Sequence, residues 1–172
     1  HYVQLGDEIM LTINEYKLGN ESYYERIVKI DDNDATVDTI RPRAVVVSRK
    51  GRPYYLNYDS DMQVQSNAFS YINSVLSEKS VNTQIKAHVA LKFLFAFEEL
   101  IRKSLADFLP EDVVSLKYFL HGYSHQGQIY TMNLSTIRSN DTVNGYLSVY
   151  RSYLQYLGIE KHPLFQTSGR IS

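Results

Sequence analysis

The chain has 172 residues and a mass of 19.9 kDa, and its 44% hydrophobic, 13% aromatic and 22% charged residues are typical of a folded protein and not of a disordered segment. It contains no cysteine, which excludes disulfide bonds, thiolate metal sites and a cysteine nucleophile. Eighteen basic residues stand against nineteen acidic ones, for a formal net charge of -1, so any binding of nucleic acid has to depend on a local basic surface.

The first sixty residues predict a small β-rich extension. Short runs rich in Val, Ile, Tyr and Thr are separated by turn-forming residues, and they predict strands at residues 23–30, 35–40, 44–48 and 54–58. The last two runs predict a hairpin across Arg49-Lys50-Gly51-Arg52-Pro53. Because so short a sheet is marginal alone, we expect it to pack against the rest of the chain.

From residue 61 to residue 165 the apolar spacing becomes helical and predicts four helices. The first begins at Ser60, with Gln63 completing a capping box, and its apolar side is Val64, Ala68, Ile72, Val75 and Leu76. The second, residues 82–102, is the central helix, with Ile85, Val89, Phe93, Phe97 and Leu100 on its core side. The third runs from Pro110 to Gly122 and buries Val113, Leu116, Phe119 and Leu120.

A polar connection, residues 123–138, leads to the fourth helix. Ser139 caps this helix, Gly158 ends it, and Pro163 is expected to prevent further helix. The fold class predicted is therefore α+β: a β-rich unit at 1–60, a mainly α four-helix domain at 61–165, and the start of a linker at 166–172.

The side of the fourth helix away from its core carries small polar residues and one cation, at three- and four-residue steps: Asp141, Asn144, Gly145, Ser148, Arg151, Ser152 and Gln155. Such a face allows close approach of another surface and offers hydrogen bonds. The second helix adds Lys86 and Lys92, with no acidic residue between Ser80 and Phe97. Together the two faces indicate contact with DNA, against the alternative of two ordinary solvated faces.

The stretch from Arg41 to Arg52 carries five cations and no acidic residue. It is open to two interpretations, a phosphate-contacting ribbon or an edge strand protected from aggregation by its charges. We find no convincing set of catalytic residues, and we expect neither a metal nor a cofactor.

The helical part resembles the core-binding (SAM-like) domain of tyrosine recombinases, the phage and transposon integrases. The segments that carry the resemblance are Ser80-Val81-Asn82-Thr83, the Pro-started third helix, and the fourth-helix run from Ser139 to Leu157, which includes Thr-Val-Asn, then Leu-Ser, then Arg151. Two features depart from the family: His162-Pro163 replaces the Asn-Pro that often follows this helix, and no histidine is followed three residues later by arginine, so the catalytic His-x-x-Arg box is missing.

The resemblance implies that the chain is the amino-terminal DNA-clamping part of an integrase without its catalytic domain, so this segment itself would not be an enzyme. The family places its second and fourth helices against DNA beside the cleavage site. The DNA-binding residues this implies are Asn82, Thr83, Lys86, His88 and Lys92 of the second helix, Arg138 of the connection, and Thr142, Asn144, Ser148 and Arg151 of the fourth helix.

The partners expected are double-stranded DNA and other recombinase protomers, in the cytoplasm of a bacterium and associated with its nucleoid, and the gene would belong to a phage or other mobile element. No membrane segment or secretory signal is expected, and the first residues, which lack Met, look like those of a piece of a longer protein. Two alternatives stay open: a helical module that binds another protein, and a DNA-binding regulator that does not recombine DNA.

Overall fold

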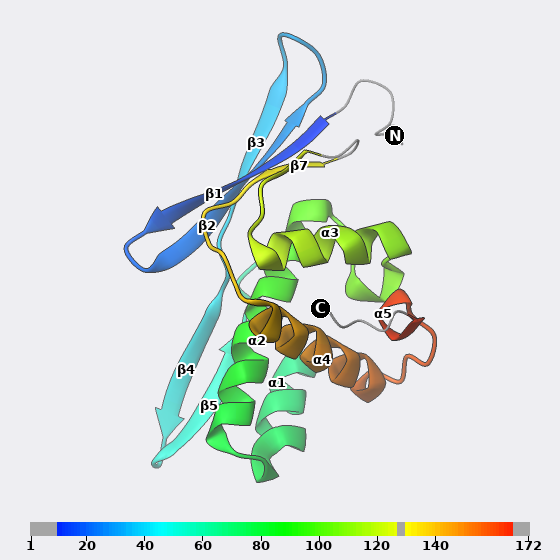
Figure 1. Ribbon diagram of the computed structural model, residues 1–172. Coiled ribbons are helices and arrows are strands. Elements are labelled where there is room, and N and C mark those ends of the chain that lie inside the picture. Colours follow the sequence, from blue (N-terminus) through cyan, green and yellow to red (C-terminus); the bar gives the residue numbers. More distant parts are fainter. Residues whose placement is uncertain (1–9, 127–129, 167–172) are drawn as a thin grey trace.

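A twisted sheet forms the upper layer of the molecule and helices pack beneath it (Figure 1). The computed structural model describes residues 10–126 and 130–166. The sheet has the strand order β3-β2-β1-β7-β6. Its strands are β1 (Met10–Leu18), β2 (Glu21–Lys29), β3 (Ala35–Ile40), β6 (His125–Gln126) and β7 (Tyr130–Asn133). The α+β class is confirmed, as are the predicted strands at 23–30 and 35–40.

Three strands of this sheet, β1, β6 and β7, were not predicted. Strand β1 lies at its centre, antiparallel to β2 and parallel to β7, with Leu11 opposite Tyr130 and Ile13 opposite Met132. Strands β6 and β7 come from the connection between α3 and α4, so the sheet joins the N-terminal strands to a segment more than a hundred residues away. The β unit therefore depends on residues far beyond position 60.

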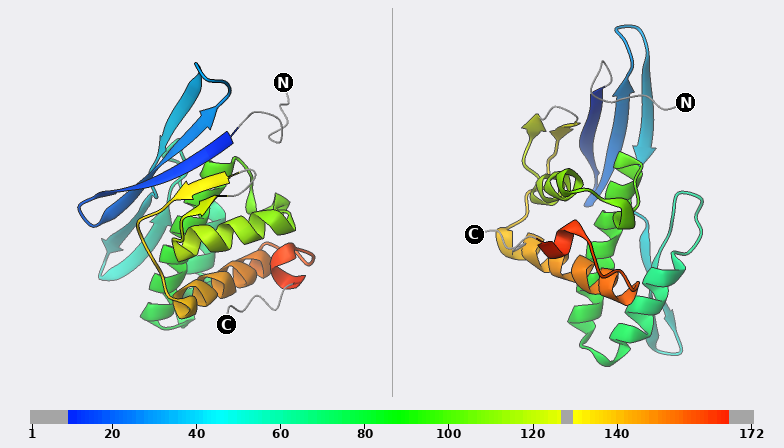
Figure 2. Two further views of the ribbon diagram at one scale, coloured as in Figure 1. Left: turned by 45° about the horizontal axis from the view of Figure 1, so that its top comes forward. Right: turned by 90° about the vertical axis from the view of Figure 1, so that its right-hand side faces the viewer.

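The predicted hairpin is confirmed. It consists of β4 (Ala44–Arg49) and β5 (Arg52–Asn57) and lies along the central helix, on the side away from α4 (Figure 2). Asn73 attaches it to the helices: its side-chain oxygen accepts a hydrogen bond from the Tyr55 N–H at 2.8 Å, and its amide donates to the Tyr55 carbonyl at 2.8 Å. Asn73 thus satisfies the free edge of β5 with one buried side chain.

The helices are α1 (Ser66–Asn73), α2 (Val81–Ile101), α3 (Pro110–His121), α4 (Asn140–Tyr156) and α5 (Pro163–Gln166), with 3-10 turns at Val75–Glu78 and Leu105–Asp107. The predicted start of the first helix at Ser60 is wrong. The Asp59 carboxylate accepts hydrogen bonds from the Asp61 and Gln63 N–H groups, and this side chain holds a turn that delays the helix to Ser66.

Two further expectations about the helices are wrong. Val64, Val75 and Ile85 were assigned to the core, but they are 40%, 51% and 44% exposed. Pro163 does not end the helical structure, because it opens α5, where the fixed φ of proline suits a first turn. The expected linker lies outside the described residues apart from Gln166, the last residue of α5.

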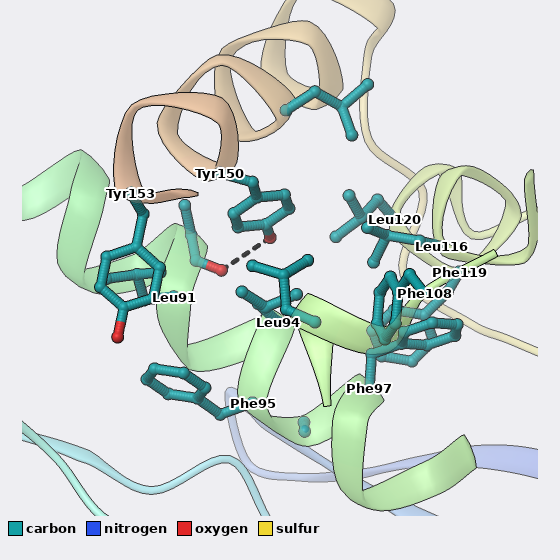
Figure 3. Packing of buried hydrophobic residues seen from close by; sticks show 14 of the residues in the cluster. Leu91, Leu94, Phe95, Phe97, Phe108, Leu116, Phe119, Leu120, Tyr150 and Tyr153 are labelled. Atoms are coloured by element: carbon teal, nitrogen blue, oxygen red, sulfur yellow. Dashed lines mark hydrogen bonds between the residues drawn. The ribbon is translucent and has the colours of Figure 1, made fainter. Parts of the chain in front are cut away.

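Helix α2 is the central helix of the hydrophobic core. Figure 3 shows its Leu91, Leu94 and Phe97 meeting side chains from α3 and α4. The Phe97 ring lies 5.2 Å from the Phe119 ring, and the Tyr150 hydroxyl donates to the Ala90 carbonyl at 2.7 Å. Because α2 is covered on several sides, its position fixes where α3, α4 and the hairpin can lie.

Gly122, at the end of α3, anchors the connection that follows. Its φ of +81° is left-handed, and a Cβ at this position would lie 1.6 Å from the Thr136 carbonyl oxygen. Only glycine permits so close an approach of two backbones. Residues 134–138 are thereby held against the end of α3, just before α4 begins.

In the described part of the chain, no helix combines the length and apolar character needed to cross a lipid bilayer.

Candidate nucleic-acid interface

The predicted two-sided character of α4 is confirmed. Val143, Leu147, Tyr150 and Leu154 are buried, and Asp141, Ser148, Ser152 and Gln155 are exposed on the other side. Helical spacing places these four exposed residues in one row along the helix. Ser148 therefore lies at the centre of an open, small-residue surface.

Helix α2 contributes Lys86 to the same surface. The Lys86 side chain lies across Gly145 of α4, where a Cβ would come within 2.5 Å of the Lys86 Nζ atom. Glycine therefore lets an exposed cation of one helix lie directly on the backbone of the next. The α2–α4 contact brings together two residues singled out separately in the sequence.

Replacing Gly145 by Ala tests this arrangement. We expect Gly145→Ala to raise the free energy of unfolding by up to about 1 kcal/mol, because alanine is favoured over glycine inside a helix and the group it displaces is the end of a flexible lysine. Urea unfolding measures the effect, and Ser148→Ala on the exposed row of α4 is the control. A loss of stability would contradict a freely movable Lys86.

An aromatic pair continues this surface toward the sheet. Phe93 of α2 stacks on Tyr146 of α4, with ring centres 6.3 Å apart. Two cations lie against the Phe93 ring: the Arg138 guanidinium carbon is 4.2 Å from its centre and the Lys92 Nζ atom is 4.8 Å away. We call the continuous surface formed by Lys86, Gly145, Tyr146, Phe93, Lys92 and Arg138 the helix seam.

Arg138 is fixed in place by its other contacts. One of its terminal nitrogens donates to the Leu120 carbonyl at 3.0 Å, and its backbone N–H donates to the His121 carbonyl. Lys92 is half-buried, and burial lowers its pKa below the usual value, with Glu21 opposing that shift. The seam thus presents one guanidinium with limited freedom and one partly desolvated ammonium.

His88 does not belong to the seam, and its assignment as a DNA-contacting residue is wrong. His88 is 6% exposed, and its Nε2 atom lies 2.9 Å from the Leu56 carbonyl oxygen. Since a carbonyl oxygen only accepts, Nε2 carries the proton, and burial lowers the pKa of the ring. The sequence placed His88 in line with Lys92, but the hairpin covers it.

Arg151 is also removed from the proposed surface. Its Nε atom donates to the Leu164 carbonyl at 2.9 Å, on the side of α4 that faces α5, and its Nη2 atom is buried without a partner among the described residues. Burial lowers the pKa of the guanidinium. Arg151 therefore attaches the C-terminal turn to α4, which disfavours the DNA-contacting role that the resemblance implies for it.

Three predicted DNA contacts at the starts of α2 and α4, Asn82, Thr83 and Thr142, are exposed. Thr83 and Thr142, however, also take part in the helix caps. Ser80 accepts a hydrogen bond from the Thr83 N–H, and Ser139 accepts one from the Thr142 N–H, each at 3.2 Å. Asn82 is exposed beside the first cap, one turn before Lys86, and Asn144 is half-buried on α4. Of these, Asn82 offers the most accessible hydrogen-bonding group next to the seam.

Lys17 and Arg41 were not among the predicted DNA-binding residues. Together with Lys92 and Arg138 they line a pocket between the β1–β2 turn, the β3–β4 link and α2. Lys17 could not be placed because β1 was not predicted. Arg41 belongs to the basic stretch noted in the sequence, and its guanidinium carbon lies 5.5 Å from the centre of the Tyr23 ring.

No model of a known protein family matches the chain, and neither the curated proteins nor the solved structures contain a significant match. Within residues 10–126 and 130–166, no three His, Asp or Glu side chains gather in a way that could hold a metal ion. The helix seam is therefore the feature of this chain from which a function can be inferred.

Proposed function

We propose that this chain binds double-stranded DNA across the helix seam, as the four-helix core-binding part of a site-specific tyrosine recombinase. In this proposal the chain clamps DNA beside the site of cleavage and contacts other protomers there. The breaking and rejoining of DNA strands would need residues that this chain does not contribute.

One observation carries the proposal: the seam joins cations, aromatic rings and small polar groups on one outward surface of two adjacent helices. Lys86 supplies an exposed charge, and Ser148 and Asn82 flank it with exposed hydrogen-bonding groups. Cations and small polar side chains of this kind make most contacts to DNA phosphates. Neutralising phosphates locally is sufficient for binding even though the whole chain is slightly acidic.

The geometry also weakens the two alternatives. A helix-docking module would place a partner helix over Gly145, where the exposed Lys86 ammonium would have to move away or lose its water, whereas a DNA phosphate would pair with that charge. A helix-turn-helix regulator would need a short turn before its second helix, but β6 and β7 lie between α3 and α4. These observations favour the duplex over a partner helix and the core-binding arrangement over a helix-turn-helix.

The test is duplex binding by the whole chain, measured by fluorescence anisotropy over a series of salt concentrations. We expect affinity to fall steeply between about 50 mM and 200 mM salt, and Lys86→Gln to reduce the slope of log affinity against log salt by about one, the value for a single lost phosphate contact. Lys86 is exposed, so folding should be unaffected.

Lys161→Gln is the matched control, because Lys161 is an exposed lysine beyond the end of α4, and its loss is expected to leave the slope unchanged. Absence of duplex binding at low salt would overturn the proposal. Binding that does not respond to salt would also overturn it, since a protein-docking surface behaves in that way.

A further inference from the structure

A cationic pocket lies where the sheet, the β3–β4 link and α2 meet. Its volume is about 210 Å³, and its lining includes Lys17, Arg41, Lys92, Arg138 and Glu21. Four cations therefore face one another across the pocket with a single carboxylate among them. We call this the cationic pocket.

Ion pairing does not account for these charges. Within the described ranges the ion pairs are Arg43–Glu99, Arg102–Asp38 and Lys103–Asp112, and none of them uses a cation of the pocket. Arg41 and Lys92 instead lie against aromatic rings, which hold the side chains in place without neutralising them. The cationic pocket thus retains a net positive charge in a partly desolvated space.

Two hydroxyl-bearing residues, Ser22 and Thr136, also line the pocket. Their hydroxyls donate to the Glu15 carboxylate, so the donors left for an anion in the pocket are the cations. Arg138 donates to the Leu120 carbonyl and also binds the Tyr24 hydroxyl, and because a guanidinium carries five N–H groups, it still has donors for an oxyanion. A single water occupies about 30 Å³ of liquid, so the pocket has room for a tetrahedral anion and several waters.

We infer that the cationic pocket binds a phosphate group, held by Arg41, Lys92 and Arg138. The source of this phosphate rests on the proposed DNA function. If that function holds, the phosphate belongs to the duplex backbone, because Arg138 and Lys92 also form the sheet-side end of the helix seam. A phosphate here would neutralise charges from the β unit and from α2 together. It would extend the DNA path from the helices onto the β unit.

The experiment titrates the whole chain with inorganic phosphate and follows the backbone amide resonances of Ser22 and Thr136 by NMR. Lys92→Met keeps the aliphatic part of the side chain and removes the charge, and the lowered pKa of Lys92 indicates that the fold tolerates this loss. Arg41→Gln removes an exposed charge. Lys161→Gln is the control.

We expect phosphate to shift both resonances in the wild type and in Lys161→Gln, with a loss of these shifts in Lys92→Met and Arg41→Gln. A duplex titration then separates the two sources. If the same variants lower the salt slope for duplex binding by about one each, the ligand is a DNA phosphate. If duplex binding is unchanged in them, the pocket holds the phosphate of a small molecule.

Shifts that are absent in the wild type, or equal in the wild type and both pocket variants, would overturn the inference. In that case the DNA proposal is tested separately, by the salt dependence of duplex binding in Lys86→Gln. Conversely, a wild type that binds phosphate but no duplex would support the pocket and contradict the proposed function.

Discussion

Replacing Glu98 by Gln is expected to stabilise the protein by about 3 kcal/mol at about pH 8 and to have little effect at about pH 4. Glu98 lies on the C-terminal half of α2 and is largely buried. Burial raises the pKa of its carboxyl from 4.5 to about 7, the neighbouring Glu99 raises it further, and the hydrogen bond from the Leu105 N–H opposes the shift.

The direction of the pH effect follows from these values. A carboxyl whose pKa is higher in the folded state favours folding while it is protonated, so its contribution is complete below about pH 4.5 and is lost as the pH rises through about 7. Above that range the folded protein holds a buried negative charge. Gln stays neutral at every pH, and its side-chain oxygen can still accept from the Leu105 N–H, which Glu98 now binds at 2.6 Å.

Urea unfolding of the wild type and of Glu98→Gln over this pH range measures the difference directly. Burial lowers the pKa of His88 in both proteins, and the comparison cancels its contribution. Glu160→Gln, at an exposed position, should give no pH-dependent difference from the wild type. Equal stabilities of the wild type and Glu98→Gln at about pH 8 would show that Glu98 is not a buried charge.

Helix caps and strands were predictable where a few neighbouring residues in the sequence specify them. Ser139 caps the helix that it was expected to cap, and strands β2 to β5 lie where runs of β-branched and aromatic residues predicted them. Strand β1 was missed because Glu15 occupies the third inward position after Leu11 and Ile13 and breaks the apolar alternation. Strand β7 was missed because it pairs with a strand more than a hundred residues away, which no local pattern specifies.

The candidate site was predictable only in part, for a related reason. Helical spacing correctly placed Lys86 and Ser148 on exposed faces. It could not show that the hairpin covers His88 or that Arg151 binds the carbonyl of Leu164, because those contacts depend on where distant segments pack. Two basic residues of the Arg41–Arg52 stretch prove to have internal partners: Arg43 pairs with Glu99 at 3.0 Å, and Arg52 donates to the Asn73 carbonyl.

Replacing Glu15 by Ala is expected to destabilise the protein by about 3 to 5 kcal/mol, as estimated for a buried charge that satisfies several donors. The Glu15 carboxylate is 8% exposed and accepts four hydrogen bonds. The Ser22 and Thr136 hydroxyls donate to one oxygen at 2.5 Å, and the Ser135 and Thr136 N–H groups donate to the other at 2.9 Å. Alanine would leave two backbone N–H groups without their acceptor.

Glu15→Gln separates the charge of the side chain from its shape. Burial raises the pKa of Glu15, but the four hydrogen bonds outweigh burial and hold the pKa below its usual 4.5. The stability that the charge provides is therefore present above about pH 4.5 and is lost as the pH falls through the folded pKa. Unfolding of Glu15→Gln in urea should show a loss of about 1 to 2 kcal/mol at neutral pH that shrinks in acid.

Glu15 also connects the stability of the fold to the cationic pocket. The Ser22 and Thr136 residues that it holds line that pocket, so Glu15→Gln should also weaken the phosphate-induced shifts of their amides. Thr136→Val, which removes one donor to Glu15 and keeps the branched shape, should cost less than Glu15→Ala. If Glu15→Ala costs no more than Thr136→Val, the carboxylate does not hold the connection before α4, and the cationic pocket must be positioned by Gly122 and Arg138 alone.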